Sequence, residues 1–181
     1  MINNSSQYDE LFKKFGLKFS IDWKLLKAQV RQESNFNPDA VNKISGAKGL
    51  AQFMDKTWQE WCDLTPGIQQ LKENYNPFNP EQSISAQAAY MSFLIKIIDR
   101  LLTQVSADKT YLIHWTLAAY NWGIGNLVGK MVKNKKKTGL LQFSEFKYPN
   151  AENYLPHETA NYVRQIMKYY QEYQQEDNLH E

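Results

Sequence analysis

Cysteine is nearly absent from this sequence. Cys62 is the only one, which excludes an internal disulfide framework and a cysteine-rich zinc site. The three histidines, His114, His157 and His180, are scattered without metal-binding spacing, so the pattern does not favour metal catalysis. The net charge is only +2, so the chain lacks the strong positive electrostatic field that is typical of nucleic-acid-binding proteins. We therefore expect no metal, no cofactor and no nucleic-acid partner.

Long apolar runs and a secretory leader are also lacking. No uninterrupted apolar run reaches the roughly 18 residues of a membrane-spanning helix. The N-terminal sequence MINNSSQYDELFKKFG has no basic region followed by an apolar one, unlike a signal peptide. We expect neither a membrane span nor a secretory signal in this chain.

Helical periodicity is what the sequence does contain. The 181 residues fit one domain, and an apolar share of 43% excludes wholesale disorder. Period-two alternation is nearly absent, so the class is all-α. We predict an N-terminal extension over residues 1–19, the domain over 20–175 and a polar tail over 176–181. The clearest helix follows Asn79 and Pro80, with an apolar stripe that predicts core positions: Ile84, Ala88, Met91, Ile95, Ile98 and Leu102.

Cap and turn residues predict where the other helices begin and end. Ser20 or Asp22 can cap a helix that runs to about Ser34 and is ended by Pro38, and we expect an extended link that passes through Pro38. Thr57 is predicted to cap a short helix. Two glycines within residues 45–49 indicate a tight turn where the backbone can approach a ligand. Later helices are predicted over about 108–120 and from about 158 onward.

Glu33 has an unusual position on the first of these helices. Leu26, Val30 and Glu33 fall at i, i+4 and i+7, so the glutamate continues an apolar face. Burial without a cation raises a carboxyl pKa, and a glutamic acid that keeps its proton can act as a general acid. The alternative is a boundary glutamate that reaches solvent or Arg31 or Lys27, and periodicity alone does not separate the two.

Several short motifs together resemble a known family. The short motifs ES at 33–34, GLAQ at 49–52 and AYN at 119–121 are similar to the three signatures of the soluble lytic transglycosylase domain, a lysozyme-like family that cleaves peptidoglycan. Three further segments occur in the same order as in the family and extend the resemblance over about residues 20–170: NFNP at 35–38, NPFNPEQ at 76–82 and ETANYV at 158–163. The resemblance implies an all-α, lysozyme-like single domain with a groove between the Glu33 helix and the Tyr120 and Tyr162 elements.

The resemblance also implies a mechanism. A single glutamate, Glu33, protonates the glycosidic oxygen and then acts as base on the muramic C6 hydroxyl, giving a 1,6-anhydro sugar without water. The Glu-x8-Asp pattern of phage-type lysozymes is absent, since Asn42 holds that position. Asp39 and Asp55 leave a second carboxylate open, although a turn role and a helix-end role fit them better. The alternatives are a hydrolysing muramidase and a non-catalytic glycan-binding structural component.

Five further residues receive substrate-binding roles from the resemblance. Ser34 is expected to hydrogen-bond near the catalytic centre, Gln52 to contact the substrate, and Tyr120 and Asn121 to line the groove. Tyr162 is expected to hold the catalytic carboxyl by a phenolic hydrogen bond. The plainer interpretations are a helix-end serine for Ser34, a residue on a helix surface for Gln52, an asparagine C-cap for the Tyr120–Asn121 pair and a core tyrosine for Tyr162.

The expected partners are the glycan strands of peptidoglycan. The basic run Lys133–Lys137 is typical of a solvated surface, with attraction to anionic cell-envelope polymers as the alternative. We expect a monomer that acts at the bacterial cell wall, in the periplasm or outside the cell. It would reach that site as a phage virion or lysis protein, or as a mature form whose signal was removed.

Overall fold

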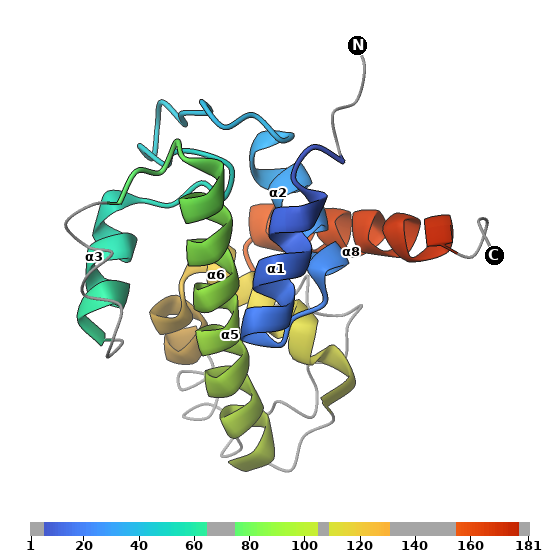
Figure 1. Ribbon diagram of the computed structural model, residues 1–181. Coiled ribbons are helices and arrows are strands. Elements are labelled where there is room, and N and C mark those ends of the chain that lie inside the picture. Colours follow the sequence, from blue (N-terminus) through green and yellow to red (C-terminus); the bar gives the residue numbers. More distant parts are fainter. Residues whose placement is uncertain (1–5, 65–74, 105–108, 131–154, 178–181) are drawn as a thin grey trace. The chain divides into compact units, whose positions relative to one another are not determined.

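The protein is all-α wherever its structure is described. A computed structural model describes residues 6–64, 75–104, 109–130 and 155–177 (Figure 1). These ranges contain helices and two isolated β-bridges but no strand, which confirms the predicted class. None of the helices described is both long and apolar enough to cross a membrane. The helices that lie wholly within these ranges are α1 (Asp9–Phe19), α2 (Trp23–Ser34), α3 (Asp55–Leu64), α5 (Pro80–Gln104), the 3₁₀ helix η1 (Lys109–Tyr111), α6 (Leu112–Trp122) and α8 (His157–Asp177).

The chain divides into two compact units. The first unit combines the residues up to Tyr90 with those from Tyr169 on, and the second runs from Met91 to Lys168. The first unit therefore contains α1, α2, α3, the start of α5 and the end of α8. The second contains the rest of α5, η1, α6 and the start of α8.

Helix α2 begins and ends where predicted, but a different residue ends it. The Asp22 side chain accepts a hydrogen bond from the Lys24 backbone N–H at 2.9 Å, so Asp22 is the cap, while Ser20 ends α1 with a φ of 57°. The helix is ended by Asn35, whose φ of 49° is left-handed and whose N–H donates to the Arg31 carbonyl. The prediction that Pro38 ends it was wrong, because an asparagine tolerates this conformation and stops the helix three residues before the proline.

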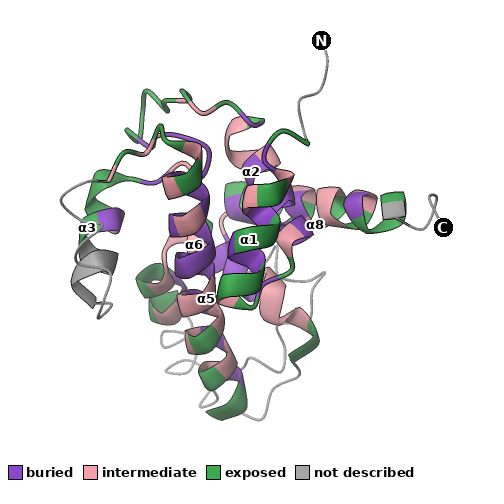
Figure 2. Ribbon diagram, in the orientation of Figure 1, coloured by how far each residue is buried: buried purple, intermediate pink, exposed green. Residues whose placement is uncertain are grey.

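The first unit holds α2 on several sides. Residues 24–30 are all buried (Figure 2). Helix α1 packs against α2, and the Lys27 ammonium lies 2.8 Å from the Asp9 carboxylate. From α5, the buried Gln87 amide donates to the Gln29 side chain at 2.9 Å and to the Leu26 carbonyl at 3.1 Å. These two buried hydrogen bonds fix how α5 lies on α2.

Asp9→Asn is expected to lower the free energy of unfolding by about 2 kcal/mol, because it leaves a buried ammonium without its carboxylate. The Lys27 side chain is only 6% exposed. The matched control is Glu10→Gln on the next residue of α1, where the pair with Lys13 is largely exposed and worth less than about 0.5 kcal/mol. Urea unfolding of both variants measures the difference. Equal losses would show that the buried pair adds nothing.

The other predicted helices are present with small shifts at their ends. Helix α3 starts at Asp55 rather than after Thr57, and α6 starts at Leu112 after a 3₁₀ turn. At the start of α5, the Asn79 side chain caps the Gln82 N–H at 3.0 Å, but the Gln82 side chain accepts from the Asn76 N–H. Of the predicted apolar stripe only Ile95 is half-buried, and the others are at most 1% exposed: Ile84, Ala88, Met91, Ile98 and Leu102.

In the second unit, α6 carries a histidine that resists protonation. Burial lowers the pKa of the His114 imidazole below its ordinary value of 6.5. The Tyr111 ring meets it edge-on, with centroids 5.4 Å apart. The His114 pKa is therefore lower in the folded protein than in the unfolded chain. At a pH between these two pKa values, the unfolded chain binds a proton at this histidine and the folded protein does not.

We therefore expect stability to be fully present above pH about 6.5 and to fall as the pH drops toward the folded pKa. The variant His114→Gln removes this titration and should lose less stability between pH about 7 and 5. Melting temperatures of both proteins across that range provide the test. Parallel pH profiles would contradict the expectation.

Candidate active site

Glu33 is the penultimate residue of α2 and is half-buried. Leu26 and Val30, which precede it on the same face, are 0% exposed, as the periodicity predicted. The two cations named as alternative partners are both bound to other carboxylates. Lys27 pairs with Asp9, and the Arg31 guanidinium lies 2.9 Å from the Glu172 carboxylate on α8.

The segment after α2 is a series of turns and not the predicted extended link. Asn35 and Phe36 both have positive φ, at 49° and 63°. The segment then closes on itself, because the Ala40 carbonyl accepts from the Gly49 N–H at 2.9 Å. Isolated bridges join Lys48 to Val41 and to Phe53. Two consecutive left-handed residues are costly, so this connection directly after Glu33 is held by the surrounding contacts.

Gly49 is where two of the sequence motifs meet. Its φ is 73°, and a Cβ built on it would lie 1.8 Å from the Pro77 carbonyl oxygen. The sequence predicted that a ligand could approach this glycine, whereas the group that approaches Gly49 is the chain's own backbone. Beside it, the buried Ser83 hydroxyl on α5 accepts from the Ala51 N–H at 3.2 Å. The turn is therefore pinned to the start of α5.

Gln52 lies in this turn and not on a helix surface. Its φ is 49°, and its Nε2 donates to the Gly49 carbonyl at 2.9 Å and to the Ala40 carbonyl at 3.3 Å. The plainer interpretation of Gln52 was therefore wrong. The amide oxygen is the end that these two bonds leave unused. Ser34, the last residue of α2, donates its hydroxyl to the Val30 carbonyl at 3.3 Å within the helix.

Tyr120, Asn121 and Tyr162 belong to the second unit. Tyr120 is half-buried, and Asn121 is exposed near the end of α6. Asn121 is not the C-cap, because Gly123 holds that position with a φ of 90°. Instead its side-chain oxygen accepts from the Thr159 hydroxyl of α8 at 2.8 Å. This bond turns the amide oxygen toward α8 and leaves the amide nitrogen on the other side.

Tyr162 is buried on α8, with 6% of its surface exposed. The sequence patterns gave no role of their own to Thr159 or Ser83. Both are buried hydroxyls that hold a motif residue through one hydrogen bond. A hydroxyl side chain next to apolar helix positions was the available signal, since a buried hydroxyl needs a partner.

The remaining sequence candidates do not add a second buried acid. Asp39 is exposed, and its N–H donates to the Asn37 side chain in a turn. Asp55 is the first residue of α3, and its carboxylate is 2.8 Å from the Lys48 ammonium. Within the described ranges no three His, Cys, Asp or Glu side chains gather to hold a metal ion. The basic run Lys133–Lys137 lies outside the described residues.

The chain is similar to proteins of known name over most of its length. The family profile described as "Transglycosylase SLT domain" matches residues 10–147. Membrane-bound lytic murein transglycosylase F of Haemophilus influenzae (strain 86-028NP) is 31% identical, over 92% of this chain and 34% of that protein. The protein of the same name from Histophilus somni (strain 129Pt) is 32% identical, over 90% of this chain and 33% of that protein. The chain thus spans about a third of the length of these curated relatives.

A solved structure shares the fold. The X-ray structure of an inactive glutamate-to-glutamine mutant of lytic transglycosylase Slt from Pseudomonas aeruginosa superimposes with a TM-score of 0.66 and 25% sequence identity. The match covers 96% of this chain and 25% of that one.

Proposed function

This chain belongs to the transglycosylase SLT domain family, and on that premise we propose that it is a lytic transglycosylase that cleaves peptidoglycan. The predicted family and the lysozyme-like, all-α fold are confirmed by the profile, the relatives and the solved structure. The proposed reaction breaks the β-1,4 bond between N-acetylmuramic acid and N-acetylglucosamine and leaves a 1,6-anhydromuramic end. The observation that carries it is the half-buried Glu33 at the end of the apolar face of α2.

Glu33 would act twice in this reaction. Its carboxyl first donates a proton to the glycosidic oxygen, which leaves with the N-acetylglucosamine. The resulting carboxylate then takes the proton of the muramic C6 hydroxyl as that oxygen bonds to C1 of the same sugar. The same carboxyl group gives up one proton and takes one back, so no second acid or base is needed. In the Slt relative, replacing one glutamate by glutamine gives an inactive protein, as expected for a reaction of this kind.

The surroundings of the two other candidate acids favour this single-glutamate route. Asp55 is already bonded to an ammonium, and Asp39 is exposed in a turn. A hydrolysing muramidase needs a second carboxylate to activate water, or to serve as nucleophile. Hydrolysis remains the alternative reaction, with these two residues as its candidates.

The hydrogen bonds of Gln52 and Asn121 support the substrate-binding roles proposed for them. Gln52 would accept from a substrate hydroxyl or amide, because its nitrogen is bonded within the turn. Asn121 would donate to an acceptor such as an acetamido carbonyl, because its oxygen is bonded to Thr159. The predicted roles of Ser34, Tyr120 and Tyr162 stay predictions. We propose that the protein acts as a monomer on glycan strands at the bacterial cell wall.

Digestion of purified peptidoglycan tests the proposal. The purified chain should release soluble muropeptides and lower the turbidity of a peptidoglycan suspension. Binding to the insoluble polymer without release would favour the non-catalytic glycan-binding component. Neither binding nor release would contradict the proposed substrate.

A further inference from the structure

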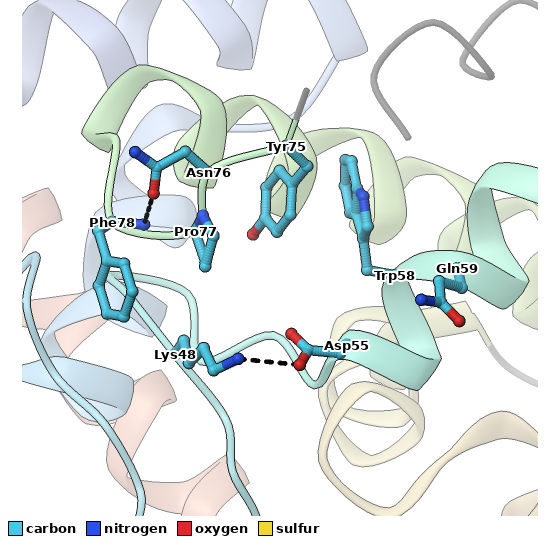
Figure 3. Close-up of a pocket in the computed structure, with 8 residues that line it drawn as sticks. All are labelled: Lys48, Asp55, Trp58, Gln59, Tyr75, Asn76, Pro77 and Phe78. Atoms are coloured by element: carbon cyan, nitrogen blue, oxygen red, sulfur yellow. Dashed lines mark hydrogen bonds and ion pairs between the residues drawn. The ribbon is translucent and has the colours of Figure 1, made fainter. Parts of the chain in front are cut away.

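A pocket lies beside the turn that carries Gln52, wholly within the first unit (Figure 3). Its volume is about 500 Å³, in the range of sites for small molecules. One wall comes from the stretch before α5, and the other from the turn and the start of α3. The residues that line it are Lys48, Asp55, Trp58, Gln59, Tyr75, Asn76, Pro77 and Phe78, and neither Glu33 nor Gln52 is among them.

Aromatic rings form the apolar part of the lining. Trp58 and Tyr75 stack with ring centroids 3.8 Å apart and an interplanar angle of 20°. The Phe53 ring meets Trp58 edge-on, with centroids 5.8 Å apart, and this second ring contact helps to fix the tryptophan in place. Phe78 is 37% exposed, although large apolar side chains are usually withdrawn from water. An exposed ring at the mouth of such a pocket is available to a ligand.

The polar part of the lining has no net charge. The Lys48 ammonium and the Asp55 carboxylate are the charged groups, and they are bonded to each other at 2.8 Å. The remaining polar groups are the Tyr75 hydroxyl, the Trp58 indole N–H and two side-chain amides. The Asn76 oxygen accepts from the Phe78 N–H at 3.0 Å, which leaves its amide nitrogen as a donor (Figure 3). Gln59 is exposed on α3 and offers both a donor and an acceptor.

We propose that this pocket is a further glycan-binding site, which takes an uncharged N-acetylated sugar. A pyranose ring has apolar C–H faces and polar edges, so aromatic rings beside amides match it. The cancelled charge of the lining disfavours an acidic peptide, which would leave its carboxylates unpaired. The inference rests on the proposed function, since the sugar would belong to the same glycan strand that is cleaved. The site would hold the strand while Glu33 acts on a bond elsewhere.

The test measures binding separately from cleavage. The protein carrying Glu33→Gln is titrated with N-acetylglucosamine tetramer while backbone amide shifts are followed by NMR. Shifts are expected at Lys48, Asp55 and Gln59. Adding Phe78→Ala should weaken the affinity at these amides about tenfold, because an aromatic contact is lost. Adding Gln59→Ala, an exposed change that does not disturb the core, should weaken it several-fold.

Leu17→Ala is the matched control, because it removes an 86% exposed apolar side chain that lies outside this pocket. The affinity of this control for the tetramer should equal that of the Glu33→Gln protein. The inference is overturned if the tetramer shifts no amide of the pocket, or if the two pocket variants bind as well as the control. It is also overturned if the acidic dipeptide Ala-Glu binds there and the sugar does not. If the wild-type protein does not cleave peptidoglycan, that result would instead count against the proposed function.

Discussion

Replacing Glu33 by glutamine is expected to lower the rate of peptidoglycan cleavage by about a thousandfold or more. Glutamine keeps the shape of the side chain but cannot donate the proton that the leaving oxygen needs. It also cannot take the proton of the attacking hydroxyl. Because one residue serves both steps, no other group is left to perform either. Release of soluble muropeptides from purified peptidoglycan, followed over time, gives the rate.

The structure predicts that this variant folds. Glu33 is half-buried at the end of α2, while the buried contacts of that helix come from residues 24–30. Glu10→Gln makes the same chemical change on an exposed part of α1 and should keep the full rate. Circular dichroism of both variants should match the wild type. A Glu33→Gln protein that keeps more than about a tenth of the rate would remove Glu33 from the mechanism.

Gly49→Ala is expected to cost about 4 kcal/mol of stability or more. The added Cβ would lie 1.8 Å from the Pro77 carbonyl oxygen and 2.7 Å from its carbon. Both atoms are backbone, so either the turn or the stretch before α5 must move. The same movement would displace Gln52 and Ala51, and cleavage should fall together with stability.

Gly46→Ala separates this clash from the strain of the backbone conformation. Gly46 has almost the same φ, 75°, but a Cβ there would meet no atom within 4 Å. Its cost should therefore be that of the left-handed conformation alone, about 1 kcal/mol. Urea unfolding of the two variants provides the comparison. Equal losses would mean that the contact between Gly49 and Pro77 does not stabilise the fold.

Local patterns in the sequence were sufficient to predict most helices. Asp22 caps α2 and Asn79 caps α5 because a short polar side chain before an apolar period satisfies free N–H groups. The stripe on α5 is buried at every position but Ile95. These features depend on residues that are only a few positions apart, so the sequence alone was enough to predict them.

Contacts between distant segments were not predictable in this way. The sequence indicated a special turn at Gly49 but could not identify Pro77 as the neighbour that requires a glycine. It likewise favoured a cap or a groove role for Asn121 without the bond to Thr159. The pocket is lined by residues from two separate stretches, and only folding brings them together. Periodicity and spacing contain no information about which distant side chains meet.

The mass of the released products tests the central claim most directly. Muropeptides from purified peptidoglycan digested by the wild-type chain should be about 18 Da lighter than the reducing forms, because no water enters the product. These anhydro products should be missing from the Glu33→Gln digest. Products with reducing muramic ends would contradict the account, since water would then be the acceptor and a second carboxylate would have to activate it.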